Sequence, residues 1–251
     1  MSINTSTIYP ESLYQADSTR CVFAFHGEQP SGEVQNLVSG GPSAAKNTGF
    51  TDSELWSTRP GWMTFGGSTK FATAAATGTQ VTMNGQSLIV TARIKKTLGA
   101  HVAATRYLIG NYTPGSNTGG FVIQATTAGA CGLTVTPVGG SAYNVFAPSG
   151  TLTDGTTANE VSLVWIASRD GFGRVGSAGV QVATTTIAGA VNANMKGGFP
   201  LKIGGVTESF EIKHLAAYNV PLDLADIPLE LLFDWSYRHP GAVIPDWVFG
   251  L

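Results

Sequence analysis

The chain has 251 residues, with 14 basic and 16 acidic side chains and a formal net charge of −2. Charged residues make up 12% of the sequence, about half the roughly 25% of an average soluble domain, whereas the apolar share of 43% is ordinary. This balance excludes a mainly disordered chain, and the lack of a basic excess excludes nucleic acid as an expected partner. The missing charge is replaced by small residues, including 32 glycines, which suits a surface that neighbouring molecules cover.

The domain organisation follows from length and hydropathy. Residues 1–14 have neither the basic start nor the apolar stretch of a secretory signal, and no window reaches the roughly 18 consecutive apolar residues of a membrane helix. We therefore expect a protein made in the cytoplasm, with no membrane partner. We predict an N-terminal segment over 1–19, a single β-sandwich domain over 20–232 and an apolar C-terminal arm over 233–251.

Short apolar alternations, broken by Gly, Asn, Pro and Thr clusters, run from residue 18 to about 220 and predict an antiparallel β-sandwich. Residues 87–95 alternate strictly and predict a half-buried strand. Residues 121–126 and 131–138 predict a hairpin around 127–130, and residues 160–168, apolar on both faces, predict a central strand.

Further along the chain, residues 171–179 are expected to form a glycine-rich turn into a strand at 180–186. Strands at 200–204 and 209–219 follow. In the last of these, the alternation places the following side chains on one face: Phe210, Ile212, His214, Ala216 and Tyr218. His214 is accordingly expected to be a core histidine.

The pattern changes after residue 220. Residues 222–227 and 228–237 predict one or two short helices, with Asp223 and Asp226 as N-terminal caps and His239-Pro240 as the stop. Residues 241–251 are apolar. Because a free apolar tail would be a liability, we expect them either to pack on their own domain or to dock on a neighbouring subunit.

The order of these segments resembles the concanavalin A-like jelly roll, in its laminin-G-like branch. The resemblance covers residues 20–232 and is carried by the opening CVFAFHG, by GWMTFGG, by LKIGG at 201–205, and above all by the ending SFEIKHLAAYNVPLD at 209–223. It implies a jelly-roll sandwich. Domains of this kind with a Gly/Thr-rich, low-charge composition resemble bacteriophage virion components, which serve as capsid decoration or as tail, baseplate or fibre modules.

Enzymatic chemistry is not expected. Glycosidases of the resembled class carry their carboxylates on one strand as ExDxxE, whereas Glu208 and Glu211 are oddly spaced here and fall on opposite strand faces. The sequence GFGRVG at 171–176 spells GxGxxG, but no helix and no acidic residue follow as a dinucleotide site requires. We therefore predict no catalytic residue and no cofactor.

Metal binding is not expected either. The acidic residues stand singly along the chain, and the four histidines show no ligand spacing. Cys21 and Cys131 lie far apart and are interpreted as small buried hydrophobic residues.

Two functions remain open. The first is a non-enzymatic virion structural protein that associates with itself and with other virion proteins, with aromatic and apolar anchors at Trp235, Tyr237, Trp247, Phe249 and Leu251. The second is a lectin-like module for a host surface glycan, because a shallow sugar site needs an aromatic platform and a few amide side chains. The candidates for that site are Trp56, Asn111, Tyr112 and Asn117.

Overall fold

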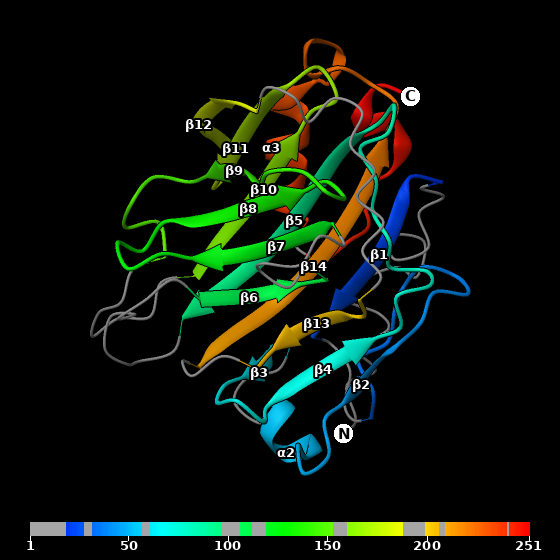
Figure 1. The fold of residues 1–251 in the computed structure, drawn as a ribbon, viewed down its shortest axis with the longest axis vertical. Coiled ribbons are helices and arrows are strands. Elements are labelled where there is room, and N and C mark those ends of the chain that lie inside the picture. The colour runs from blue at the N-terminus through cyan, green and yellow to red at the C-terminus, as the bar shows by residue number, and fades with distance from the viewer. Residues whose placement is uncertain are drawn as a thin grey trace.

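A computed structural model describes residues 19–27, 32–56, 61–96, 106–111, 119–152, 160–187, 199–205, 209–239 and 241–251. Two antiparallel seven-stranded sheets pack face to face, and the C-terminal residues form a further layer outside one of them (Figure 1). The predicted all-β antiparallel sandwich is confirmed.

The first sheet has the order β1-β14-β5-β10-β11-β12, and β3 pairs with β14 beside this path. The bounds are β1 Cys21–His26, β3 Met63–Phe65, β5 Ser87–Lys96, β10 Glu160–Ala167, β11 Phe172–Ser177, β12 Val180–Thr186 and β14 Phe210–Val220. The predicted central strand is therefore β10, which lies between β5 and β11.

The second sheet has the order β2-β4-β13-β6-β7-β8-β9. The bounds are β2 Ala44–Lys46, β4 Phe71–Ala74, β6 Arg106–Gly110, β7 Gly120–Ala125, β8 Cys131–Thr136, β9 Tyr143–Phe146 and β13 Leu201–Gly204. The predicted hairpin is confirmed, because β7 and β8 pair antiparallel with Gly120 opposite Thr136 and Ala125 opposite Cys131.

Four short helices complete the described residues: α2 Asp52–Leu55, the 3-10 helices η2 Leu224–Asp226 and η3 Asp246–Phe249, and α3 Leu229–Arg238. The two short C-terminal helical segments that the sequence predicts before residue 238 are η2 and α3. No helix in the described ranges is long and apolar enough to cross a membrane.

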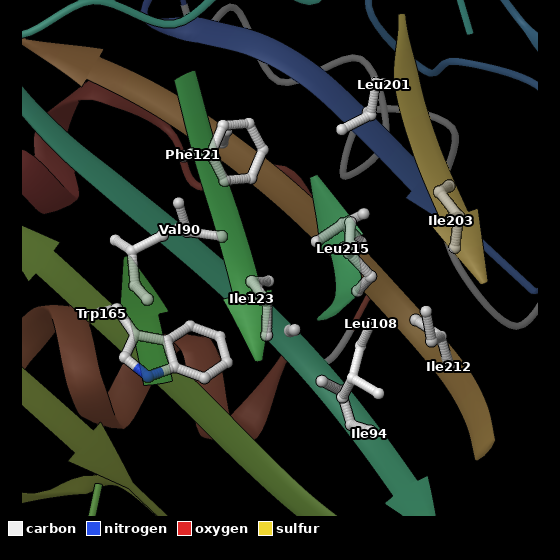
Figure 2. Close-up of a cluster of buried hydrophobic side chains, with 14 of the residues drawn as sticks. Val90, Ile94, Leu108, Phe121, Ile123, Trp165, Leu201, Ile203, Ile212 and Leu215 are labelled. Atoms are coloured by element: carbon white, nitrogen blue, oxygen red, sulfur yellow. The ribbon is translucent and has the colours of Figure 1, made fainter. Parts of the chain in front are cut away.

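The main core fills the space between the two sheets. Val90 and Ile94 point from β5, and Trp165 from β10, toward Phe121 and Ile123 of β7 (Figure 2). All five side chains are almost completely buried. The alternation of residues 87–95 therefore marks a core-facing row, as predicted, because every second side chain of a strand points to the same face. The predicted half-burial is wrong, because Ile89 on the other face is also fully buried, under the C-terminal layer.

The predicted single face of β14 is wrong. Phe210 and Ile212 belong to the core between the sheets, whereas Ala216 and Tyr218 lie on the outer face, under the C-terminal layer. A register shift between Ile212 and His214 causes the change, because one extra residue in a strand moves every later side chain to the opposite face.

The C-terminal residues pack on their own domain. Val243, Ile244, Val248 and Phe249 are almost fully buried against the outer face of the first sheet. The backbone N–H of Ile244 donates to the hydroxyl of Tyr218 over 3.0 Å. This decides between the two expectations for residues 241–251 in favour of the intramolecular one.

The predicted helix caps are corrected. Asp223 stands at the N-cap of η2 but makes no capping hydrogen bond, because its Oδ1 accepts from Nε of Arg169 over 2.5 Å. Asp226 is the last residue of η2, and Pro228 occupies the N-cap of α3. The predicted boundary after Leu232 falls inside α3, and residues 1–18 of the predicted N-terminal segment lie outside the described residues.

The glycine-rich stretch 171–179 is a strand, β11, with tight turns on either side, and this corrects the predicted turn. A Cβ at Gly173 would lie 2.7 Å from Cγ2 of Thr185, and one at Gly176 would overlap the ring of Phe233. These two glycines therefore allow close packing on both faces of β11. Gly171 and Gly179, with φ of 87° and 85° in the turns before and after β11, use the positive φ on which the prediction relied.

Candidate functional site

An open groove of about 970 Å³ lies between the β11–β12 hairpin on one side and η2 and α3 on the other. Figure 1 shows α3 beside β11 and β12, at the end of the first sheet where the strand order terminates. The groove is lined by Asp170, Phe172, Arg174, Gly179, Val180, Gln181, Leu224, Ala225, Ile227, Leu229, Glu230, Phe233 and Asp234.

The hairpin wall is shaped by its two-residue turn. Ala178 and Gly179 have φ of 50° and 85°, and positive φ at both central positions matches the twist of a two-stranded β-ribbon. Among the described residues, Ala178 is the only non-glycine with positive φ. The turn brings Val180 and Gln181 to the groove opposite α3, and Tyr237 of α3 lies next to Gly179.

The helical wall is fastened to the sheet by the turn between β10 and β11. Arg169 forms an ion pair with Asp223, 2.5 Å from Nε to Oδ1, and donates from Nη1 to the carbonyl of Gly85 over 3.2 Å. Oδ2 of the adjacent Asp170 accepts from the backbone N–H of Leu224 over 3.3 Å. These contacts fix η2, and with it the mouth of the groove, against the first sheet.

The groove combines an apolar floor with a polar rim. Leu224, Ile227 and Phe233 form the buried floor, whereas Phe172 and Val180 stand 44% and 61% exposed on the wall. Such exposed apolar side chains beside a hollow are typical of a contact surface. The rim holds more negative than positive charge.

Three carboxylates and one guanidinium make up that rim: Asp170, Glu230, Asp234 and Arg174. Arg174 is bound within the hairpin, where Nη1 donates to Oγ1 of Thr184 and to the carbonyl of Gly173. Asp234 is paired with Arg238, 2.7 Å from Oδ1 to Nε. Most of the rim charge is therefore already engaged within the chain.

The lining offers recognition chemistry. It contains no histidine, cysteine, serine or lysine, which are the usual nucleophiles and proton-transfer groups beside carboxylates. Within the described ranges, no group of three or more His, Cys, Asp or Glu side chains could hold a metal ion. What the groove can do is bury an apolar side chain of a partner and accept hydrogen bonds at the rim.

Of the four residues predicted to bind a glycan, two lie in the described part of the chain. Trp56 caps the C-terminal end of α2, half-buried against the main core, and its Nε1 has no hydrogen-bond partner in the described chain. Asn111 is buried after β6, where Oδ1 accepts from the N–H of Phe121 over 3.0 Å. Tyr112 and Asn117 lie outside the described residues.

The predicted assembly anchors divide into two groups. Trp235 and Phe249 are 7% and 0% exposed within their own chain, so these side chains are not available to a partner in this structure. Tyr237, Trp247 and Leu251 are exposed, and their role as anchors stays a prediction.

His214 is buried on the outer face of the first sheet, and its Nε2 lies 3.0 Å from Oγ1 of Thr91. Burial, together with the nearby His26, lowers the pKa of His214 to about 3. Cys21 and Cys131 are free thiols, and burial raises the pKa of each to about 12. These values fit the predicted core roles of His214 and Cys131, because a neutral imidazole and an un-ionised thiol are the forms that burial favours. Cys21 is half-buried at the side of the C-terminal cluster, which corrects its predicted full burial.

Sequence reasoning missed the groove because it assigned residues 171–179 to a turn. A local signal was present in two apolar side chains: Phe172 begins β11, and Val180 begins β12 directly after the turn. Their neighbours across the groove, Leu224 to Asp234, come from a segment far away in the sequence, which no local pattern relates to them.

No protein-family model matches the chain, and no curated protein matches it. Solved structures do share its fold. The binding domain of botulinum neurotoxin serotype G is similar with a TM-score of 0.65 at 11% identity, over 87% of this chain and 50% of that one. The binding domain of Paraclostridial Mosquitocidal Protein 1 gives a TM-score of 0.65 at 9% identity, over 88% and 52%.

At such low identity these similarities show the fold alone, an all-β sandwich. The chain spans about half the length of the binding domains that it matches.

Proposed function

We propose that the chain is a non-enzymatic binding domain that makes protein–protein contacts through one face. We call it the groove face and define it by Phe172 of β11 and Val180 of β12, which line the groove, and by Tyr237 of α3, which lies beside the turn that joins the two strands. This gathering of three large exposed apolar residues on three adjacent elements carries the proposal. Similar structures are named as binding or receptor-binding domains, which supports the binding part of it.

Within that role we propose a structural component of a bacteriophage virion, either a capsid decoration protein or a tail, baseplate or fibre component. The resemblance of the strand order to the laminin-G-like branch supports this assignment. The low charged fraction of 12% supports it as well, because a surface covered by neighbouring subunits needs little charge to stay soluble. The expected partners are other virion proteins, and the expected location is the assembled particle.

Sedimentation of a lysate from the source system tests this proposal. We expect the chain to travel with assembled particles, in hundreds of copies for a capsid decoration protein and in a few or tens for a tail or fibre part. Recovery in the soluble fraction alone would refute the virion assignment.

A matched pair of variants localises the contact. Val180 on the groove face and Val138 after β8 are both exposed, at 61% and 50%. We expect Val180→Ser, combined with Phe172→Ser, to reduce co-sedimentation at least about tenfold, because both apolar contacts are lost. Val138→Ser should retain it. Equal retention by both variants would show that the contact lies elsewhere.

Glycan binding is a second candidate, and one feature of the groove favours it. The exposed ring of Phe172 stands in the same groove as Gln181 and Arg174, and an aromatic surface beside planar polar groups suits a sugar ring. A panel of host surface polysaccharides tests this function. Gln181→Ala should lower binding without lowering thermal stability, and binding to no member of the panel would exclude it. Trp56→Ala and Tyr112→Ala test the site predicted from the sequence.

A further inference from the structure

In the described part of the chain the two sheets of the sandwich have five edge strands: β1, the three-residue β3 and β12 in the first sheet, and β2 and β9 in the second. An edge strand presents unpaired backbone N–H and C=O groups to which another strand can add. These edges differ in length and in what covers them, and that difference points to one of them.

The edge of β1 is covered by the segment that follows it. The carbonyl of Ala24 accepts from the N–H of Leu37 over 2.8 Å, and the N–H of Ala24 donates to the side-chain oxygen of Asn36 over 3.0 Å. Isolated bridges join Phe25 to Asn36 and Gly27 to Gly61. Residues 36, 37 and 61 therefore already occupy backbone hydrogen-bonding groups of β1 and of the adjacent Gly27 that an added strand would need.

Both edges of the second sheet are short. β2 has three residues, and Val34 exchanges two backbone hydrogen bonds with Ala44, of 3.0 and 2.8 Å. β9 has four residues, and Pro148, which has no N–H to donate, follows soon after it. Neither strand offers a long ladder to a partner.

The edge strand β12 differs in three respects. It has seven residues, the sequence VQVATTT contains neither a charge nor a proline, and most of its side chains are exposed, with Val180 at 61% and Val182 at 37%. Lysine, proline and short length are three usual protections of an edge, and β12 has none of these three. A fourth, a β-bulge, is confined to Val182, and residues 183–186 after it pair with residues 172–175 as a regular antiparallel run.

We infer that β12 is a self-association edge, on which β12 of a second copy of this chain adds antiparallel and joins the two first sheets across a two-fold axis. The inference rests on the proposed function, because it names a partner for the groove face. In a two-fold antiparallel pairing of identical strands only the residue at the axis meets its own copy, but any charge on the strand occurs twice in the same interface and repels there. VQVATTT has no charge to repel, and threonine favours cross-strand threonine.

The neighbourhood of β12 suits the same partner. Tyr237 of α3, 47% exposed, stands next to Gly179 at the start of the strand, so an antiparallel pairing along β12 places one Tyr237 at each end of the interface. The paired backbone then supplies hydrogen bonds, and the groove face supplies apolar burial. Strand pairing and apolar contact together make the interface specific.

Sedimentation equilibrium across a concentration series tests the inference, with a matched pair of variants. We expect the wild-type chain to dimerise. Val182→Lys places like charges at the two-fold interface and should weaken dimerisation at least about tenfold, whereas Val138→Lys, an exposed valine away from β12, should leave it unchanged. Both positions are exposed, so folding is expected to be retained.

A cysteine scan over residues 183–186 gives an independent readout. Burial raises the pKa of both native thiols to about 12, so an introduced cysteine is the reactive one under mild oxidation. An antiparallel pairing brings only the position nearest the two-fold axis within disulfide distance, so we expect one position to cross-link far faster than its neighbours. A cysteine at Val138 should not cross-link.

A monomer at every concentration would overturn the β12 pairing, and a dimer that Val182→Lys leaves intact, with no preferred cross-link, would overturn it as well. A monomer that still sediments with particles separates the two proposals, because it refutes the pairing and leaves the virion role standing. A β12 cross-linked dimer found only in the soluble fraction would support the pairing and refute the virion role.

Discussion

At the scale of single residues, Gly176 controls how closely α3 can approach the first sheet. A Cβ at this position would overlap the ring of Phe233, which is 2% exposed and forms part of the groove floor. We expect Gly176→Ala to lower the free energy of unfolding by about 1–3 kcal/mol, because an extra methyl group in a packed site displaces its neighbours. Urea denaturation measures this change.

Two variants show whether overlap is the cause. Ser177→Ala, at the next and half-buried position of β11, should change stability little. Gly176→Ala combined with Phe233→Leu should recover part of the loss, because the smaller side chain makes room for the methyl group. If the double variant is destabilised by the sum of the two single changes, the overlap explanation fails.

Because His214 is buried, we expect the free energy of unfolding to fall in acid. Its pKa is lowered to about 3 in the folded chain by burial and by His26, whereas an unfolded histidine titrates near 6.5. The unfolded chain therefore binds the extra proton between these values. The stabilisation is fully present above about pH 6.5 and is lost as the pH falls toward 3, by up to about 1.4 kcal/mol per pH unit.

Denaturation of the wild type and of His214→Gln at pH 7 and pH 5 measures this linkage. Between these two pH values the wild type should lose about 2 kcal/mol more than the variant, because glutamine does not titrate. Equal losses in both proteins would mean that the imidazole becomes protonated without unfolding the chain.

At the scale of elements, the C-terminal segment after α3 is a structural layer of the sandwich. Its link to β14 is the hydroxyl of Tyr218, which accepts from the N–H of Ile244, and the rings of Tyr218 and Phe249 lie 5.4 Å apart. We expect Tyr218→Phe to lower the free energy of unfolding by about 1–3 kcal/mol, because it leaves a buried N–H unpaired. Tyr237→Phe, at an exposed position, should have almost no effect.

The elements also show what a single sequence can predict. Strands with regular alternation, such as residues 87–95, are found from the pattern because each buried side chain leaves a period of two. The register shift in β14 and the strand β11 were not predicted. In both cases the cause lies in how strands and helices pack together. An extra residue exchanges the faces of β14 after Ile212. The glycines of β11 are required by Phe233 and Thr185, whose side chains lie elsewhere in the sequence.

At the scale of the whole molecule, the candidate site could not be predicted for the same reason. The groove joins residues 170–181 to residues 224–234, and only the folded chain brings these segments together. The composition, by contrast, already indicated a surface made for contact. With 12% charged residues and a net charge of −2, the chain has little electrostatic repulsion to keep copies apart.

The low charge predicts how association depends on salt. Between about 0.1 M and 1 M salt the Debye length falls from about 10 Å to about 3 Å, which screens contacts between exposed charges but not apolar burial or backbone hydrogen bonds. Because β12 is uncharged, we expect the dissociation constant of self-association to change by less than about threefold over this range. Sedimentation equilibrium measures it. A steep weakening would instead assign the contact to the charged rim of the groove, where Glu230 and Asp234 stand on α3.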